Sequence, residues 1–134
     1  MKHLIPLALL AACGLAGAET PRQIQDVYAV EASRQQAGFK PLASRGAGFY
    51  ARKFGASETM PGCTACHTDD PARPGRHAVT GKAIKPLLPA ANADRFTDSA
   101  KVEKWFRRNC TEVVGRECGA AEKADFIAFL TEGR

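Results

Sequence analysis

The stretch Cys63-Thr64-Ala65-Cys66-His67 determines how the rest of this chain is interpreted. Two cysteines separated by two residues and followed directly by histidine are typical of covalent attachment of c-type haem. This spacing lets both thiols add to the two vinyl groups of the macrocycle, and the histidine then offers an imidazole nitrogen to the iron as proximal ligand. The motif therefore predicts one covalently bound haem c, held by Cys63 and Cys66, with His67 on the iron.

Two other interpretations of this motif exist, and both are weaker. A structural zinc site needs about four protein ligands, and the motif supplies only part of such a set. A thioredoxin-like redox Cys-x-x-Cys expects a βαβ context, whereas this sequence shows no strand pattern. Haem attachment is therefore the favoured interpretation.

The first 18 residues have the features of a secretory signal peptide. Lys2 gives a positive start, residues 4–12 are apolar and too short to span a bilayer, and Ala16-Gly17-Ala18 is a cleavage motif. We expect cleavage after Ala18 and a periplasmic mature protein. The stretch ending in Cys13 also resembles a lipobox, so a lipid anchor on Cys13 is the alternative, and it would bring the protein to a membrane.

Length and charge restrict the remaining possibilities. The chain has 134 residues and a formal net charge of +5, and we expect one domain over residues 19–134. Residues 1–18 contain one lysine and no acidic residue, so the mature chain has 18 basic and 14 acidic residues, a net charge of +4. A mild positive charge suits docking to an acidic protein surface. No basic stripe interleaved with aromatic residues indicates a nucleic-acid partner.

Five cysteines are present, and two of them have no role in export or haem attachment. Cys110 and Cys118 form an even pair in an oxidising compartment, which predicts a disulfide. Its closed loop of nine residues would stabilise the fold by about 2.5 kcal/mol in the chain-entropy model. Two free buried thiols are the alternative.

Hydrophobic periodicity predicts an all-α fold. The expected helices span residues 21–36, 44–54, 99–110 and 120–130. Their expected start signals are Thr20 with Pro21, then Ser44, then Thr97 or Asp98. Residues 68–97 form a long polar loop, a length that is unusual unless the loop wraps a bound group. Gly48 inside a predicted helix indicates a close helix crossing, and Phe126, Ile127 and Leu130 are expected to be buried.

The helix expected at residues 99–110 has one apolar stripe. Val102, Trp105 and Phe106 lie at i, i+3 and i+4, and Asn109 follows at i+7 on the same stripe, which we expect to face inward. On the opposite side we expect three basic residues, which are candidates for docking an acidic partner: Lys101, Lys104 and Arg108.

The sequence leaves the sixth iron position open between several side chains. Met60 lies three residues before Cys63, which is a poor position for a distal ligand. His77 would give a bis-histidine haem, although a surface or propionate-contacting role is favoured for it. A lysine such as Lys82 or Lys85 would first have to lose its proton. Asn109 would offer a neutral amide, or else hydrogen-bond to backbone.

Several motifs in this sequence match one family throughout nearly the whole mature chain. These are Cys-Thr-Ala-Cys-His at 63–67, Gly-Arg-His at 75–77, Gly-Lys-Ala-Ile at 81–84, Arg-Phe-Thr-Asp at 95–98, Lys-Val-Glu-Lys-Trp-Phe-Arg-Arg-Asn-Cys at 101–110 and Val-Gly-Arg-Glu-Cys at 114–118. The chain resembles the sphaeroides haem protein family, which are class I c-type cytochromes. One departure is Gly119-Ala120, where relatives tend to have Thr-Ala, and it predicts a weaker cap for the last helix.

The resemblance implies a fold, ligands and partners. The implied fold is the class I cytochrome c fold with an extra N-terminal helix and a single haem. Carried over by position, Asn109 is the sixth ligand of ferric haem, displaced on reduction, and Cys110 pairs with Cys118 beside the haem. The implied gaseous ligands are O2, NO or CO, and the implied redox partner is a dihaem c-type cytochrome.

Three functions are compatible with these features. The favoured one is electron transfer coupled to binding of O2 or NO at ferrous haem after Asn109 is released. A plain periplasmic electron carrier is the second, and a haem enzyme that reduces O2 or converts NO is the third. No catalytic acid–base residue is indicated, so a gas-binding electron carrier is favoured over a classical enzyme.

Overall fold

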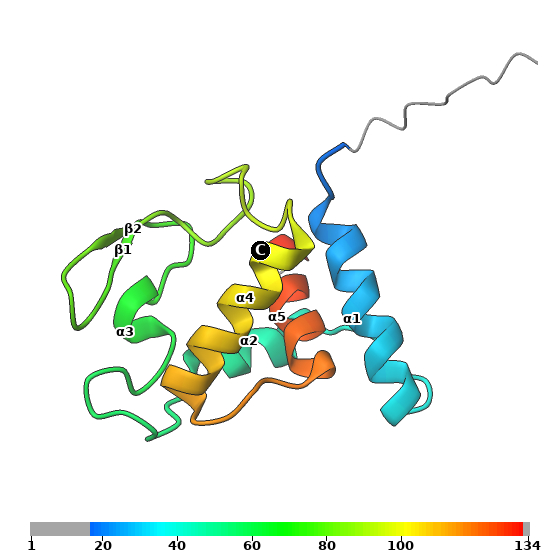
Figure 1. The fold of residues 1–134 in the computed structure, drawn as a ribbon, viewed down its shortest axis with the longest axis horizontal. Helices are drawn as coiled ribbons and strands as arrows, with labels where there is room; N and C mark the ends of the chain where they lie inside the picture. Colours follow the sequence, from blue (N-terminus) through cyan, green and yellow to red (C-terminus); the bar gives the residue numbers. More distant parts are fainter. Residues whose placement is uncertain (1–16, 133–134) are drawn as a thin grey trace, which may run out of the picture.

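The computed structural model describes residues 17–132, and most of their regular structure is helical (Figure 1). The elements are α1 (Pro21–Gln35), α2 (Ala43–Ala51), α3 (Thr64–His67), β1 (Gly75–Arg76), β2 (Ala83–Ile84), α4 (Ser99–Asn109), a π-helical turn (Cys110–Val114) and α5 (Ala120–Glu132). Most of the predicted signal peptide, with Cys13, lies outside the described residues. None of the helices in residues 17–132 has the length and hydrophobicity needed to cross a membrane.

Helix α1 begins as the sequence predicts. The Thr20 side chain accepts a hydrogen bond from the Gln23 backbone N–H, and the Gln23 side chain accepts one from the Thr20 backbone N–H. Pro21 occupies the first turn, where its missing N–H costs nothing. The buried side of α1, which includes Ile24 and Ala32, packs against α5.

Helix α2 differs from its prediction at both ends. It begins at Ala43 and not at a Ser44 cap, and it ends at Ala51 and not at Phe54. Leu42, its N-cap residue, makes no side-chain cap; its backbone N–H donates to the Asp125 carboxylate of α5 at 2.7 Å. A contact with a distant residue therefore replaces the local cap that the sequence predicted.

The close crossing of α2 and α5 is present, but the predicted glycine is wrong. At Gly46 the backbone lies so close to Asp125 that any side chain would overlap the Asp125 carbonyl oxygen. Gly48, in contrast, faces open space, with no atom within 4 Å of the position of a Cβ. Arg45 strengthens the same junction, because its Nε lies 2.7 Å from the Asp125 carboxylate.

The segment expected to be an irregular loop contains a small antiparallel hairpin. Gly75 pairs with Ile84 and Arg76 with Ala83. Strands of two residues are too short to give an alternating pattern in the sequence, so the expectation of no strand was wrong here. The rest of the segment reaches the interior, since Leu87 and Phe96 are both buried.

The main core lies between the terminal helices and the segment before α4. Its buried members are Ile24, Tyr50, Leu87, Phe96, Val102, Ile127 and Leu130. Burial of Ile127 and Leu130 is as predicted, whereas Phe126 is only partly buried at the edge of the core. Cys63 and Phe106 also pack against this cluster, so the predicted haem motif and α4 share one hydrophobic support.

Candidate haem site

The predicted haem motif forms a single helical turn. Cys63 is the N-cap residue of α3 and already has helical dihedral angles, and the His67 backbone N–H donates to the Cys63 carbonyl at 3.0 Å. Positions i, i+3 and i+4 share one side of a helix, so Cys63, Cys66 and His67 point the same way. Both cysteines are free thiols. Across residues 17–132, no three His, Cys, Asp or Glu side chains lie close enough together to hold a metal ion by themselves.

Two parts of the fold that the sequence does not indicate, Tyr50 and the hairpin, hold α3 in place. The buried Tyr50 hydroxyl, from α2, donates to the Thr68 carbonyl at 2.6 Å and lies 3.2 Å from the His67 carbonyl, where the helix leaves carbonyls without partners. The hairpin approaches from the other direction. A side chain at Gly75 would overlap the Cys66 carbonyl oxygen, and the Ala78 backbone N–H donates to Cys66 Sγ at 3.3 Å.

The electrostatics of the motif suit metal binding. Burial, followed by the positive charge of Arg95, lowers the pKa of His67 to about 4. Its imidazole is therefore neutral near pH 7, and a neutral imidazole nitrogen is the form that binds iron. Burial also raises the pKa of the Cys63 thiol to about 11, with a smaller contribution from Cys66. Arg95 was not predicted as a site residue.

Helix α4 places Asn109 differently from the prediction. Asp98 caps α4, as one of the two expected caps, by accepting from the Lys101 backbone N–H at 2.9 Å. Val102 and Cys110 are buried, but Asn109 is exposed and was wrongly expected to face inward. At about 100° per residue, Phe106 and Cys110 lie about 40° and 80° to one side of Val102 and form the packed face with it, whereas Asn109 and Trp105 lie about 20° and 60° to the other side, at the edge of that face.

Trp105 lies beside Asn109 on the exposed side of α4. The sequence predicted that its side chain would face inward, and this was wrong. Its side chain is 43% exposed, and the Arg108 guanidinium lies 5.7 Å from the centre of its ring. Arg108 therefore covers the tryptophan and does not lie on the opposite side of the helix. An exposed indole on a partly apolar helix face is a surface suited to covering a flat aromatic group.

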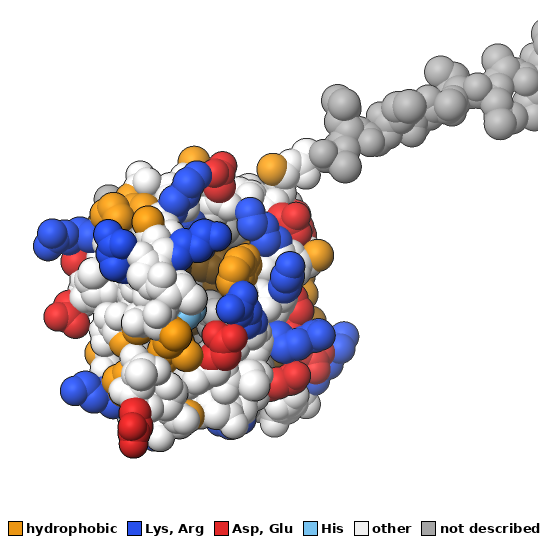
Figure 2. All heavy atoms as spheres, turned by 60° about the vertical axis from the view of Figure 1, so that its left-hand side comes forward, with side chains coloured by type: hydrophobic (Ala, Val, Ile, Leu, Met, Phe, Trp, Pro, Cys, Tyr) orange, Lys and Arg blue, Asp and Glu red, His pale blue; other side chains and the backbone are white. Residues whose placement is uncertain are grey.

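The face that carries α3 and the hairpin is hollowed. Figure 2 shows hydrophobic side chains within this hollow, Lys and Arg side chains around it, and a histidine visible inside. The histidines among the described residues are His67 and His77, and both are half-buried. The hollow thus combines apolar walls with a basic rim.

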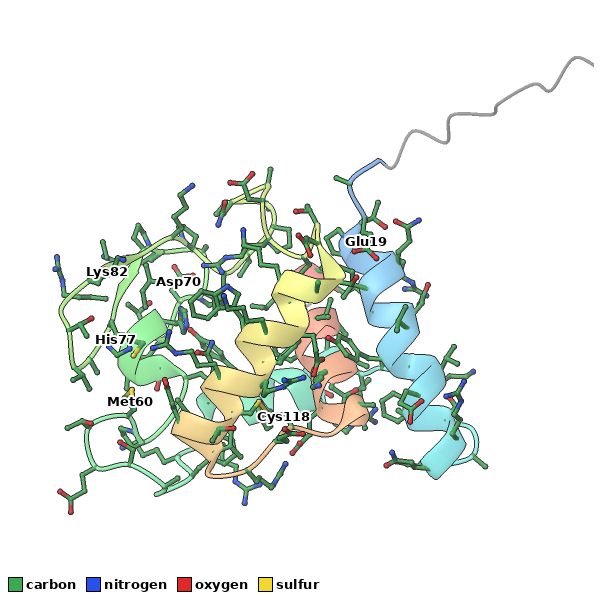
Figure 3. The ribbon with its side chains drawn as sticks, in the orientation of Figure 1. Glu19, Met60, Asp70, His77, Lys82 and Cys118 are labelled. Atoms are coloured by element: carbon green, nitrogen blue, oxygen red, sulfur yellow. A yellow bond between two sulfur atoms is a disulfide. The ribbon has the colours of Figure 1, made fainter. Side chains whose placement is uncertain are left out.

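The other candidates for the sixth iron position do not lie on α4. Met60, His77 and Lys82 all lie around α3 on the side turned away from α4 (Figure 3). His77 belongs to the hairpin turn, where its Nδ1 accepts from the backbone N–H groups of Val79 and Thr80 at 3.2 and 3.3 Å. Lys85 is exposed and its Nζ lies 3.6 Å from the Asp94 carboxylate.

The Cys110–Cys118 pairing expected from the sequence is present, with the two sulfur atoms 1.98 Å apart. Cys110 directly follows Asn109 and begins the π-helical turn. The Asn109 side chain makes no capping hydrogen bond to that turn. The disulfide therefore anchors the backbone next to Asn109. The Asn109 side-chain amide makes no cap contact and can bind another group.

These residues fit a c-type haem. Two free thiols and a neutral imidazole share one side of α3, and α4 presents an exposed indole and an unengaged amide. Cys63 and Cys66 would hold the macrocycle and His67 would bind the iron. The mostly helical fold and this site together define a c-type cytochrome.

Comparisons with known proteins agree. A family model described as "Domain of unknown function (DUF1924)" matches residues 35–130. "Cytochrome c-type protein SHP" from Cereibacter sphaeroides is 47% identical over 130 residues, which cover 96% of this chain and 96% of that protein. The chain therefore belongs to the DUF1924 family, within which it is a homologue of SHP.

Solved structures of relatives have the same fold. Oxidised SHP, described as an oxygen-binding cytochrome c, matches with a TM-score of 0.77 and 43% identity, covering 86% of this chain and 98% of that one. The solution structure of cytochrome c'' from Methylophilus methylotrophus, described in relation to haem-ligand detachment, matches with a TM-score of 0.71 and 36% identity, covering 84% and 92%.

Proposed function

We propose that this protein is an exported monohaem c-type cytochrome that couples electron transfer to binding of O2 or NO at ferrous haem, with Asn109 as the displaceable distal ligand. Cys63 and Cys66 form the thioether links, and His67 is the proximal ligand. When bound, the haem supplies a one-electron couple and, in its ferrous form, affinity for diatomic gases. The relatives support this proposal, because SHP is described as oxygen-binding and cytochrome c'' in relation to haem-ligand detachment.

The observation that carries the proposal is the state of Asn109. This residue ends α4, is exposed, and makes no capping hydrogen bond, while its neighbour Cys110 is fixed by the disulfide. A neutral amide is a weak donor and suits ferric iron better than ferrous iron, which carries less charge. We expect Asn109 to leave on reduction, after which its amide is free to donate a hydrogen bond to the gas.

We also propose a cellular location and a redox partner for this protein. We infer export to the periplasm with cleavage after Ala18, with a lipid on Cys13 as the alternative. Intact mass of the purified protein distinguishes these, because a lipoprotein would begin at Cys13 and carry acyl chains. For a redox partner we infer an acidic surface on a cytochrome, of the dihaem c-type, which would meet the basic side chains around the hollow face (Figure 2).

Optical and electron paramagnetic spectra test the proposed ligand. In the ferric state we expect a low-spin spectrum that becomes high-spin on anaerobic reduction and changes rapidly when CO or NO is added. Asn109→Ala should leave the ferric protein high-spin, or with water in that position. Lys104→Ala, on the exposed side of the same helix, is the matched control and should keep the wild-type spectra.

Two results would contradict the proposal. An unchanged ferric spectrum in Asn109→Ala would remove this residue as ligand. A low-spin ferrous spectrum that resists gas would indicate a permanent second ligand and a plain electron carrier, and His77→Ala would then identify that ligand. Sustained O2 or NO turnover with an electron donor would instead indicate an enzyme.

A further inference from the structure

Thr68, the residue that follows His67, has a backbone conformation that glycine adopts freely and other residues rarely do. Its φ is 64° and its ψ is 175°. A branched side chain such as that of threonine is strained in this region of backbone space. The left-handed conformation that commonly ends a helix has a much smaller ψ, so this is not an ordinary helix end. Thr68 keeps this conformation because its surroundings hold it there.

Hydrogen bonds engage every polar group of Thr68. Its backbone N–H donates to the Thr64 carbonyl at 3.1 Å, and its carbonyl accepts from the Tyr50 hydroxyl at 2.6 Å. Its Oγ1 donates to the Asp70 carbonyl at 2.9 Å and accepts from the Asp70 backbone N–H at 3.2 Å. The strained residue is therefore restrained from both directions along the chain and, through Tyr50, from a different helix.

Tyr50 makes its contact from a rigid position in the core. The residue is 3% exposed, and the centre of its ring lies 5.4 Å from that of Phe129 and 6.2 Å from that of Phe126. Its hydroxyl is also 3.2 Å from the His67 carbonyl. Because the packed ring fixes the position of the hydroxyl, Tyr50 opposes any movement of the backbone at the end of α3. The core is thus connected directly to the backbone of the proposed iron ligand.

We propose that Tyr50 and Thr68 are positioning residues that keep His67 on the iron while the ligand on the opposite side is exchanged. The inference rests on the proposed function, in which Asn109 leaves and a gas binds. A strongly bound gas weakens the bond from the iron to the ligand opposite it, and NO has the largest effect. Without the Tyr50 hydroxyl, Thr68 relaxes from its strained conformation and displaces His67. The Tyr50 contact therefore confines ligand exchange to one side of the iron.

Tyr50→Phe tests the proposal in the haem-loaded ferrous protein with NO added. The hyperfine pattern of the electron paramagnetic spectrum reports whether an imidazole nitrogen remains opposite NO. We expect the ratio of histidine-free to histidine-bound iron to rise about fivefold, the equilibrium effect of losing one buried hydrogen bond. Tyr28→Phe is the matched control, since it loses a tyrosine hydroxyl that donates to Glu103 at 2.9 Å, away from α3. Its ratio should stay near that of wild type.

A double variant separates the strain at Thr68 from other effects of losing the hydroxyl. Glycine adopts the φ of Thr68 without strain, so in Tyr50→Phe with Thr68→Gly the backbone gains nothing by relaxing. The ratio should therefore return toward that of wild type, although the hydroxyl is still missing. The iron–histidine stretching band in resonance Raman spectra, recorded without gas, should shift or broaden in Tyr50→Phe and recover in the double variant.

A second pair of variants covers the case in which Tyr50→Phe does not bind haem. Thr68→Val keeps the strain and loses both contacts with Asp70, so we expect the same rise in the ratio. Thr68→Ser keeps the hydroxyl and should resemble wild type. Equal ratios in Tyr50→Phe and Tyr28→Phe, in Thr68→Val and Thr68→Ser, or no recovery in the double variant, would overturn the proposal. Absence of haem, or of gas uptake by the wild type, would instead contradict the proposed function.

Discussion

Gly46 of α2 lies directly against the backbone carbonyl of Asp125 in α5, so the two helices touch without an intervening side chain. A Cβ at Gly46 would overlap that carbonyl oxygen and lie 2.8 Å from Phe129 Cβ. Because neither backbone can move without separating the helices, we expect Gly46→Ala to lower the free energy of unfolding by about 2–3 kcal/mol. Denaturant titration of the haem-loaded protein, followed by far-ultraviolet circular dichroism, measures this.

Gly48 provides the matched control for that substitution. It lies two residues further along the same helix and has open space around its Cβ position. Alanine there should be neutral or stabilising by up to about 1 kcal/mol, since alanine is the better helix former. Equal losses in the two variants would show that the crossing does not depend on Gly46.

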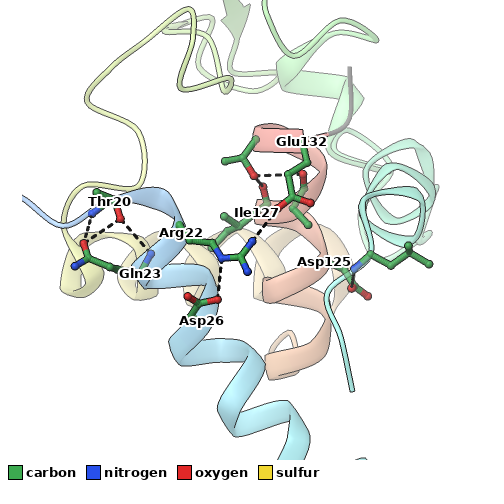
Figure 4. A network of polar contacts seen from close by, with 10 residues as sticks. Thr20, Arg22, Gln23, Asp26, Asp125, Ile127 and Glu132 are labelled. Carbon is green, nitrogen blue, oxygen red and sulfur yellow. Dashed lines mark hydrogen bonds and ion pairs between the residues drawn. The ribbon is translucent and has the colours of Figure 1, made fainter. Parts of the chain in front are cut away.

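Local signals explain why much of the fold was predictable from the sequence. The start of α1 depends on Thr20 and Pro21, which the sequence predicts as cap and first turn, and on Gln23, three residues after Thr20 (Figure 4). The start of α2 depends on Asp125, 83 residues away from Leu42. A single sequence contains no sign of that pairing, which is why the start of α2 and the crossing glycine were assigned to the wrong residues.

The candidate haem site likewise contains some features that local sequence predicts and others that depend on contacts between distant segments. The motif at 63–67 and the Cys110–Cys118 pair follow from spacing and composition alone. Tyr50 and Arg95 contribute through hydrogen bonds to backbone carbonyls in other segments, and such contacts leave no pattern in the sequence. Asn109 lies on α4 as the sequence predicts, but periodicity did not show that it lies at the edge of the packed face and not within it.

The disulfide should stabilise both the fold and the position of Asn109. Replacing Cys110 and Cys118 together with serine avoids a leftover thiol and should lower the free energy of unfolding by about 2.5 kcal/mol. Because Cys110 adjoins Asn109, we also expect a broader ferric electron paramagnetic spectrum, from a less uniform ligand position. A variant with unchanged spectrum and stability would show that the π-helical turn alone fixes Asn109.

The start of α5 should make stability depend on pH. The Glu122 carboxylate lies 2.6 Å from Arg116 and accepts from the Gly119 backbone N–H at 2.9 Å, so it caps the helix where Gly119 offers no side chain. The hydrogen bond from Arg116 lowers the pKa of Glu122, against the opposing effect of burial. A lowered native pKa stabilises the fold above the unfolded value of about 4.3, and this stabilisation is lost as the pH falls through the native pKa.

Glu122→Gln tests this pH dependence. At pH 7 we expect it to be less stable than wild type by about 0.5–1 kcal/mol, a small value because Arg116 is more than half exposed. The difference between the two proteins should shrink below about pH 4. A difference that stays constant down to pH 3 would mean that the carboxylate acts only through its shape.

Glu19, the residue that follows the predicted cleavage site, should stabilise the start of α4. Its backbone N–H donates to the Thr97 carbonyl at 3.1 Å, and its carboxylate accepts from the Ser99 backbone N–H at 2.5 Å (Figure 3). Negative charge at a helix N-terminus is favourable, so Glu19→Ala in the mature protein should lower the free energy of unfolding by about 0.5–1 kcal/mol. Glu58→Ala, in an exposed loop, is the control and should have no effect. Added salt should reduce the Glu19 effect, and an effect that does not depend on salt would assign the stabilisation to the hydrogen bond alone.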